Sequence, residues 1–318
     1  ANEVRITGAA VTVVDEDAID LGASTVSGTY TVTAGGAVTD SGTQEITGVT
    51  TISASGRDVT LNTATNNFAA AVGITGAAVT VVDEDAIVLG ASTVSGTYNL
   101  TAGGAVTQSG ALAITGATTI SASGRDVTLN TATNNFAAAV GITGANVAVV
   151  DAGAIDLGAS TVSGTYAVTA TAGGDITDSG VLSISGTSTL TVADGRSIIL
   201  DEASTFGTVT FVASSSGTIA AVTINDSNAF DLAALTLTGD LNVTEGGAVT
   251  QSGTLVIPGT TTISASGYAV TLGDSSNNFG TTAITGANVA ITDTNAIILG
   301  ASPVTGTYTV TAGGAITE

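Results

Sequence analysis

Residues 6–42 read ITGAAVTVVDEDAIDLGASTVSGTYTVTAGGAVTDSG, and this stretch returns four more times, with small changes, along the 318-residue chain. With the Ala of its DAI-like element as the anchor, the copies fall at Ala18, Ala86, Ala154, Ala229 and Ala296. The sequence numbers of successive anchors differ by 68, 68, 75 and 67. Such periodicity is typical of a repeat array, in which each unit buries its apolar surface against its neighbour.

Each long repeat divides into three shorter units. The tripeptides at residues 6–8, 26–28 and 46–48 (ITG, VSG and ITG) recur at a constant spacing of 20, and the next one, at residues 74–76, follows after 28. Because solenoid coils are short units of this kind, we expect coils of roughly 20 residues, grouped in three-coil repeats of about 68 residues. The third coil of each repeat carries an insertion.

When the short units are aligned, one position is always a branched aliphatic residue. The column reads Val13, Val32, Ile52, Val81, Leu100, Ile120, Val149, Val168, Leu190, Ile224, Val243, Ile263, Ile291 and Val310. The residue before each member is Thr, Asn or Ala, so outward and inward positions alternate with the period of two that is typical of β-strands. The abundant Thr, Val and Ile also favour extended backbone over helix.

A second column runs in parallel and is aliphatic apart from Phe230. It begins with Ile19, Val38, Val59 and Ile87. Like residues at a fixed period indicate coils that lie directly over one another, with Gly after each ITG-like element turning the corner through its freedom to take positive φ. An antiparallel sandwich would pair unlike positions, so it is the less favoured alternative.

The expected fold is thus an all-β, parallel β-solenoid of about 14 coils. We expect a single continuous solenoid over residues 1–318. Ala1 is equivalent to Ala69, and Glu318 to Asp40, so both ends fall inside a unit. We interpret the chain as a segment of a longer repeat array.

The insertion in the third coil reads LNTATNNFAAAVG at residues 61–73 and recurs at residues 129–141. Its Asn, Thr and Ala content predicts a loop that leaves the coil. We expect four phenylalanines to fold back from these loops onto apolar surface, namely Phe68, Phe136, Phe206 and Phe279. Loops repeated every three coils would alternatively form a lateral contact surface.

The charge balance excludes two classes of partner. The chain has 26 acidic and 4 basic residues, a net charge of −22, and such a surface repels nucleic acid and anionic lipid. No apolar run approaches the roughly 20 residues of a membrane span. We predict neither nucleic-acid binding nor membrane insertion.

An acidic cluster supplies the candidate metal ligands. Carboxylate oxygens that lie close together can hold Ca²⁺. The alternative interpretation is that these residues are solvated loop acids, and no other cofactor is predicted. The six candidates for divalent-cation binding are Asp15, Glu16, Asp17, Asp83, Glu84 and Asp85.

Catalytic residues are not apparent. Enzymes on β-helical folds combine acids with Lys, Arg or His, and this chain has no Lys or His. One equivalent position in three repeats holds an arginine, namely Arg57, Arg125 and Arg196. We expect Arg57 to form a surface ion pair with the adjacent Asp58. A side chain repeated at equivalent positions along a repeat array usually has a structural role. We therefore predict no catalytic site and no enzymatic activity. Ice binding through outward Thr columns is disfavoured because Ala148 and Ala167 interrupt them.

Three motifs carry a family resemblance: NNFAAAVGITG, AVTVVDEDAIDLGASTVSGTYTVTAGGAVTDSG and TTISASGRDVTLNTATNNF. They resemble the repeat regions of filamentous-haemagglutinin-like exoproteins, the very large bacterial proteins exported by two-partner secretion. The likeness covers essentially the whole chain. It implies a right-handed parallel β-helix, a secreted or cell-surface location, and a role in adhesion, aggregation or biofilm matrix.

Two functional hypotheses follow. The first is the structural shaft of a secreted bacterial fibre or adhesin, with segments that associate end to end so that open strand edges are covered. The alternative is a carbohydrate- or receptor-binding passenger domain that contacts surface glycans through its Asp/Asn loops, with Asn66 and Asp17 as candidate contact residues. A polysaccharide lyase is a third, less favoured reading.

Overall fold

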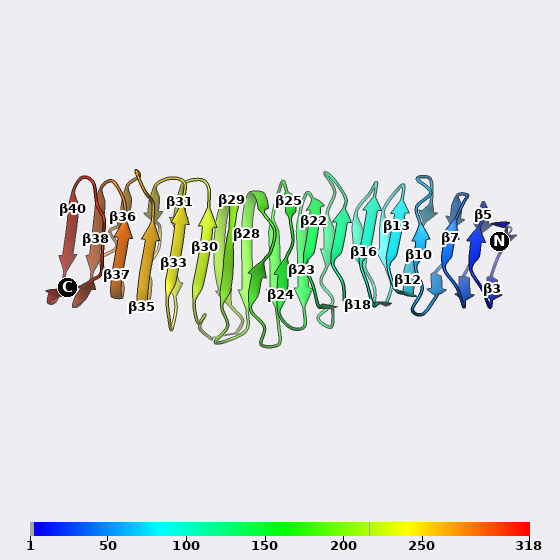
Figure 1. Ribbon diagram of the computed structural model, residues 1–318, viewed down its shortest axis with the longest axis horizontal. Coiled ribbons are helices and arrows are strands. Elements are labelled where there is room, and N and C mark those ends of the chain that lie inside the picture. The colour runs from blue at the N-terminus through cyan, green and yellow to red at the C-terminus, as the bar shows by residue number, and fades with distance from the viewer. Residues whose placement is uncertain (1–2, 216) are drawn as a thin grey trace. The chain divides into compact units, whose positions relative to one another are not determined.

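The computed structural model describes residues 3–215 and 217–318, and nearly all regular structure in them is β-strand (Figure 1). The chain divides into two compact units, Ala1–Gly164 and Thr165–Glu318. Within the described ranges no helix occurs, and none could therefore cross a bilayer.

The strands of the first unit are β1 (Glu3–Val4), β2 (Thr7–Gly8), β3 (Val11–Asp15), β4 (Ile19–Leu21), β5 (Ser24–Val26), β6 (Tyr30–Ala34), β7 (Val38–Asp40), β8 (Gln44–Ile46), β9 (Thr50–Ser53), β10 (Val59–Leu61), β11 (Asn67–Phe68), β12 (Ala71–Gly76), β13 (Val79–Asp83), β14 (Ile87–Leu89), β15 (Ser92–Val94), β16 (Tyr98–Ala102), β17 (Val106–Gln108), β18 (Leu112–Ile114), β19 (Thr118–Ser121), β20 (Val127–Leu129), β21 (Asn135–Phe136), β22 (Val140–Gly144), β23 (Val147–Asp151), β24 (Ile155–Leu157) and β25 (Ser160–Val162).

Those of the second unit are β26 (Tyr166–Ala170), β27 (Ile176–Asp178), β28 (Leu182–Val192), β29 (Ile198–Ala213), β30 (Val222–Asp226), β31 (Phe230–Leu232), β32 (Leu235–Thr236), β33 (Leu241–Glu245), β34 (Val249–Gln251), β35 (Leu255–Ser264), β36 (Val270–Leu272), β37 (Asn278–Thr285), β38 (Val289–Asp293), β39 (Ile297–Leu299), β40 (Tyr308–Ala312) and β41 (Ile316–Thr317).

The predicted parallel β-solenoid is confirmed in both units. A coil of the first unit places a five-residue strand and two three-residue strands on three faces, as in β3, β4 and β5. Val13 pairs with Val32 and Val32 with Ile52, all in parallel register. The chain makes about 16 turns of about 20 residues, rather than the 14 that the alignment predicts.

The additional turns come from the segment that the sequence assigned to a loop, and that assignment is wrong. Strand β11 pairs with β8, so Phe68 lies over Ile46. Strand β12 pairs with β9, so Ile74 lies over Ile52. Residues 62–66 make a turn and residues 69–70 a short corner, while in β12 Val72 and Ile74 alternate with Ala71 and Gly73 at the period of a strand.

The four phenylalanines are buried as predicted, with 1%, 2%, 3% and 1% of Phe68, Phe136, Phe206 and Phe279 exposed. They lie inside the stack as ordinary members of strands β11, β21, β29 and β37, and do not fold back from protruding loops.

The extra strand changes the register between repeats. Val81 stacks on Leu61 and not, as predicted, on Ile52. Each long repeat therefore makes three full turns and then advances by one of the three faces. The same step occurs between Ile120, which pairs with Ile142, and Val149, which pairs with Leu129.

The second unit repeats this advance. Ile263 pairs with Ile284, whereas Ile291 pairs with Leu272. The predicted columns are therefore correct within a repeat and wrong at these repeat boundaries. Equivalent residues of consecutive repeats in one unit lie on different faces, so the repeats do not build the single lateral surface that the sequence suggested.

The corner glycines serve a different purpose from the one expected. A Cβ on Gly28 would lie 2.1 Å from the carbonyl oxygen of Ala9, and one on Gly35 would lie 2.1 Å from that of Glu16. These corners need glycine because consecutive coils approach so closely. Among the described glycines, positive φ occurs at Gly56, Gly124, Gly173, Gly195 and Gly267.

Candidate functional site

The acid that ends the VVD element fastens one coil to the next. Asp83 is 1% exposed, and its Oδ2 accepts a hydrogen bond of 2.8 Å from the backbone N–H of Phe68 in the preceding coil. Its Oδ1 accepts one of 2.9 Å from the N–H of Asp85, which closes the local turn. Both oxygens of this predicted cation ligand are thus engaged by the backbone.

The arrangement recurs in the other repeats. Asp151 accepts N–H bonds from Phe136 at 2.7 Å and from Gly153 at 2.6 Å. Asp293 accepts bonds from Phe279 at 2.7 Å and from Asn295 at 2.8 Å. The bonded Phe and Asp belong to consecutive repeats, with the Phe at the end of one and the Asp near the start of the next, so the contact depends on the register at the repeat boundary.

Burial sets the electrostatics of these acids. Desolvation raises the pKa of Asp83 and of Asp151 above the usual range, and the backbone N–H donors partly offset that rise. The peptide dipoles of these N–H groups stabilise the charge of both carboxylates.

The remaining candidate cation ligands lie outside the coil. Glu16, Asp17, Glu84 and Asp85 are exposed, while Asp15 accepts the N–H of Asp17 at 2.8 Å. In the described part of the chain, no three or more His, Cys, Asp or Glu side chains form a group that could hold a metal ion. Cation binding by Asp15, Glu16, Asp17, Asp83, Glu84 and Asp85 stays a prediction.

A buried asparagine forms a second polar network. Asn134 is fully buried, and its Oδ1 accepts the N–H of Leu112 at 3.0 Å in the preceding coil. Its Nδ2 donates to Gln108 Oε1 at 3.1 Å and to the carbonyls of Leu129 and Val150, both at 3.2 Å. This one side chain joins three successive coils.

Equivalent asparagines occur in two other repeats. Asn66 Oδ1 accepts the N–H of Gln44 at 2.8 Å and its Nδ2 donates to Asp40 at 2.6 Å. Asn277 does the same with Leu255 at 2.9 Å and Gln251 at 3.0 Å. Because Asn66 is fully buried, it cannot contact a glycan as the sequence suggested.

Sequence reasoning missed this network. Its signal is the Asn that precedes NF in three repeats, together with an Asp or Gln 26 residues earlier, as in Asp40 with Asn66 and Gln108 with Asn134. We interpreted the Asn as loop residues because the hydrogen-bonded partner lies in another coil.

Serine hydroxyls stabilise the boundary where β12 meets two shorter strands, β14 and β15. Ser92 Oγ donates to the Gly90 carbonyl at 3.1 Å and accepts the N–H of Ile74 at 3.0 Å. The equivalent Ser160 accepts the N–H of Ile142, also at 3.0 Å. The hydroxyl supplies the acceptor that the interrupted strand lacks at this point.

The arginines also contact the backbone. Arg57 Nε donates to the Gly35 carbonyl at 3.2 Å, and Arg125 Nε donates to that of Gly103 at 3.1 Å. The predicted Arg57–Asp58 ion pair is wrong, since Asp58 Oδ1 instead accepts the N–H of Ala78 at 3.1 Å. Each of these side chains again reaches a neighbouring coil.

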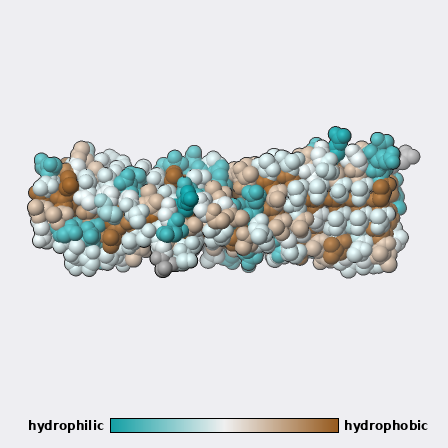
Figure 2. All heavy atoms as spheres, turned by 90° about the horizontal axis from the view of Figure 1, so that it is seen from below, coloured by the Kyte–Doolittle hydropathy of each residue, from teal (hydrophilic) through white to brown (hydrophobic). Residues whose placement is uncertain are grey.

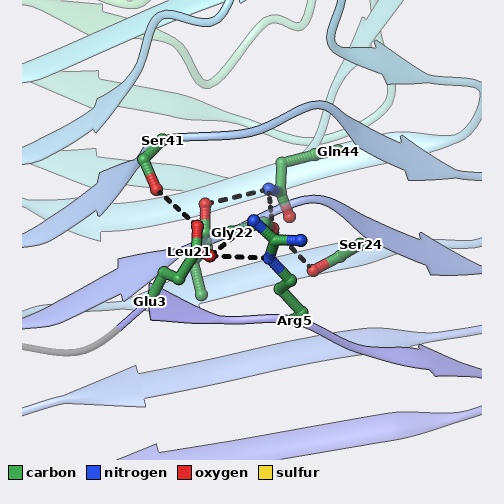
Figure 3. A network of polar contacts seen from close by, with 7 residues as sticks. All are labelled: Glu3, Arg5, Leu21, Gly22, Ser24, Ser41 and Gln44. Carbon is green, nitrogen blue, oxygen red and sulfur yellow. Dashed lines mark hydrogen bonds and ion pairs between the residues drawn. The ribbon is translucent and has the colours of Figure 1, made fainter.

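An ion pair lies near the amino end, where Arg5 contacts Glu3 at 2.5 Å (Figure 3). Beside it, Gln44 Nε2 donates to the carbonyl of Gly22 at 2.9 Å, and Ser24 Oγ donates to the same carbonyl at 3.0 Å. The network satisfies backbone carbonyls of the corner after β4.

The outward rows are mostly uncharged. On one face of the first unit Thr39, Thr60, Thr80, Asn99 and Thr119 pair in successive coils. Figure 2 shows such surface as regular rows of near-white, weakly polar residues over the amino-terminal part of the chain, at the right of the view. A surface of this kind offers hydroxyls and methyl groups and few charges.

Comparison with known proteins identifies a repeat family. A family model described as repeats of unknown function (DUF5649) matches residues 8–75, 76–143, 144–213, 219–285 and 286–318. No curated protein and no solved structure matches the chain.

Proposed function

Because the chain belongs to the DUF5649 family of repeats, whose function is unknown, we propose a function from its geometry. The chain is a structural segment in the shaft of a secreted, filamentous-haemagglutinin-like bacterial fibre or adhesin. Stacked coils give a stiff extracellular rod that serves adhesion, aggregation or biofilm matrix. The shaft carries no catalytic role.

One observation supports this proposal above all. Several polar side chains that repeat from copy to copy are used in bonds between coils, as with Asp83, Asn134 and Arg57. A binding or catalytic domain keeps such groups free for a ligand. A shaft uses them to hold consecutive coils together.

The advance of the register also suits a shaft. Within the first unit the exposed pair Glu16 and Asp17 and its equivalent, Glu84 and Asp85, lie at corners that are one face apart. Equivalent side chains are therefore distributed around the axis of the coils. A one-sided binding groove would require them on a single face.

End-to-end association is part of this proposal. A coil at the end of a β-solenoid presents unpaired N–H and C=O groups together with apolar side chains, and such an edge readily pairs with another strand. The next coil of a longer chain, or a second copy of this segment, would cover it.

Negative-stain electron microscopy of the 318-residue protein over a range of concentrations tests the shaft. We expect thin, straight particles of uniform width that lengthen by end-to-end contact as concentration rises. Compact particles of a single size at every concentration would contradict the proposal.

The alternative, a glycan- or receptor-binding passenger domain, rests on the exposed acids at the corners, such as Asp17. A glycan array probed with the isolated protein separates the two functions. The shaft predicts no saturable binding. Saturable binding to one class of glycan that is lost in Asp17→Asn would favour the passenger domain.

A further inference from the structure

One corner of the second unit differs from its equivalents. In other repeats the corner Asp pairs with an alanine of the next coil, as Asp15 does with Ala34, Asp83 with Ala102 and Asp293 with Ala312. In the second unit Asp226 of β30 pairs instead with Glu245 of β33. Two carboxyl groups therefore occupy consecutive coils at one corner.

Both side chains are buried, with 1% of Asp226 and 6% of Glu245 exposed. Asp226 Oδ1 accepts the N–H of Asn228 at 3.1 Å and of Phe206 at 3.4 Å. Asp226 Oδ2 and both oxygens of Glu245 have no hydrogen-bond partner among the described residues. Three carboxyl oxygens thus lack the partners that buried polar atoms normally have.

The neighbouring strands supply no compensating charge. In the preceding coil, Ser204 of β29 pairs with Asp226. In the following coil, Ser264, the last residue of β35, pairs with Thr244, the neighbour of Glu245. The other acids of β29, Asp201 and Glu202, are exposed. No basic side chain is present at this corner in the described residues, and the chain contains no Lys or His.

Two adjacent buried carboxylates without a cation are too costly to remain ionised together. We propose that Asp226 and Glu245 hold one proton between them at neutral pH, and that this carboxyl pair is an alkali-sensitive point of the second unit. The shared proton lets one carboxyl donate to the other, and this hydrogen bond would satisfy two of the three oxygens that are otherwise unpaired.

The charge states agree with this geometry. Burial, and then the charge of Asp226, raise the pKa of Glu245 from 4.5 to about 9, and burial raises that of Asp226. Because the pKa of Glu245 in the folded chain exceeds its unfolded value, the pair destabilises the fold progressively as pH rises from about 4.5 to 9. Above that range the carboxylates repel each other in the folded state.

Infrared spectroscopy of the full chain tests the shared proton directly. The difference spectrum between wild type and Glu245→Gln should contain the band of a protonated carboxyl at pH 7, and this band should disappear when the pH exceeds about 9. Its absence at pH 7 would overturn the proposal.

Hydrogen exchange and thermal unfolding locate the effect. Relative to Glu245→Ala, which restores the alanine of the other repeats, the wild-type segment around β30 and β33 should exchange faster at pH 9, and the difference should vanish at pH 5. The variant Ala102→Glu builds the same pair over Asp83 in the first unit and should create a second alkali-sensitive segment there.

Two results would overturn the proposal. Identical pH dependence of the melting temperature in wild type, Glu245→Gln and Glu245→Ala is one of them. The other is a rise in melting temperature of the wild type at pH 7 on adding Ca²⁺ that is absent in Glu245→Ala, because a cation and not a proton would then join the two carboxylates.

Discussion

Individual residues in this chain are best understood as connectors between coils. Asp83 and Asn134 look like exposed loop residues in the sequence, yet each satisfies backbone groups of another coil. The acidic cluster could be found from the sequence, but its division into one buried acid and two exposed ones could not. That division depends on which coil lies beneath Asp83, and a single unit of sequence does not contain this information.

Replacing the corner acid tests this role. Asp83→Ala leaves the N–H groups of Phe68 and Asp85 without acceptors, and each buried unsatisfied donor costs about 1–3 kcal/mol. We expect the free energy of unfolding to fall by about 2–4 kcal/mol, as measured by urea unfolding followed by circular dichroism.

The neighbouring Asp85→Asn is the matched control, because the Asp85 side chain is exposed. Its effect should remain within about 0.5 kcal/mol. Equal effects of the two variants would mean that Asp83 is not a structural acceptor.

Glycines of this chain act by two mechanisms that the structure separates. Gly28→Ala places a Cβ 2.1 Å from the Ala9 carbonyl oxygen and must push two coils apart. Gly56→Ala meets no atom within 4 Å but must hold a φ of 70°, which costs about 1–2 kcal/mol.

We therefore expect Gly28→Ala to lower the melting temperature considerably more than Gly56→Ala. Thermal unfolding by circular dichroism measures both. The reverse order would show that close approach of consecutive coils is not what requires glycine at the ITG-like corners.

Among the elements, β12 decides how repeats are joined. Period-two alternation predicted strands such as β6 and β9 correctly, because every second side chain of these strands is buried and the residues between them point outward. The register at the repeat boundary could not be predicted, because Ile52 meets an aliphatic residue whether Ile74 or Val81 lies over it. The hydrogen bonds of Asp83, Asn134 and Ser92 are made in the observed register.

Truncation within β12 measures how much this strand contributes. Ile74 is 1% exposed and covers Ile52, so Ile74→Ala should cost about 2–5 kcal/mol. Thr75→Ala, one residue further and facing outward, should cost much less. Urea unfolding measures both, and a cost for Ile74→Ala near that of Thr75→Ala would indicate that residues 61–73 and their continuation form a loop after all.

For the molecule as a whole, the central consequence is that the sequence repeat and the structural turn do not coincide. Within each unit a repeat ends one face beyond its starting point, so equivalent side chains of consecutive repeats in one unit face different ways. A surface built in this way spreads each exposed motif around the axis of its unit. This property fits the proposed shaft and not a one-sided binding surface.

Disulfide crosslinking tests this advance most directly, because the chain contains no cysteine of its own. Ser53 pairs with Thr75 in parallel register. Adjacent parallel strands bring such Cα atoms to about 4.8 Å, within the range of a disulfide. The account predicts that Ser53→Cys with Thr75→Cys oxidises to an intramolecular disulfide, and that Ser53→Cys with Val82→Cys does not. Efficient crosslinking of residues 53 and 82, without crosslinking of 53 and 75, would contradict it.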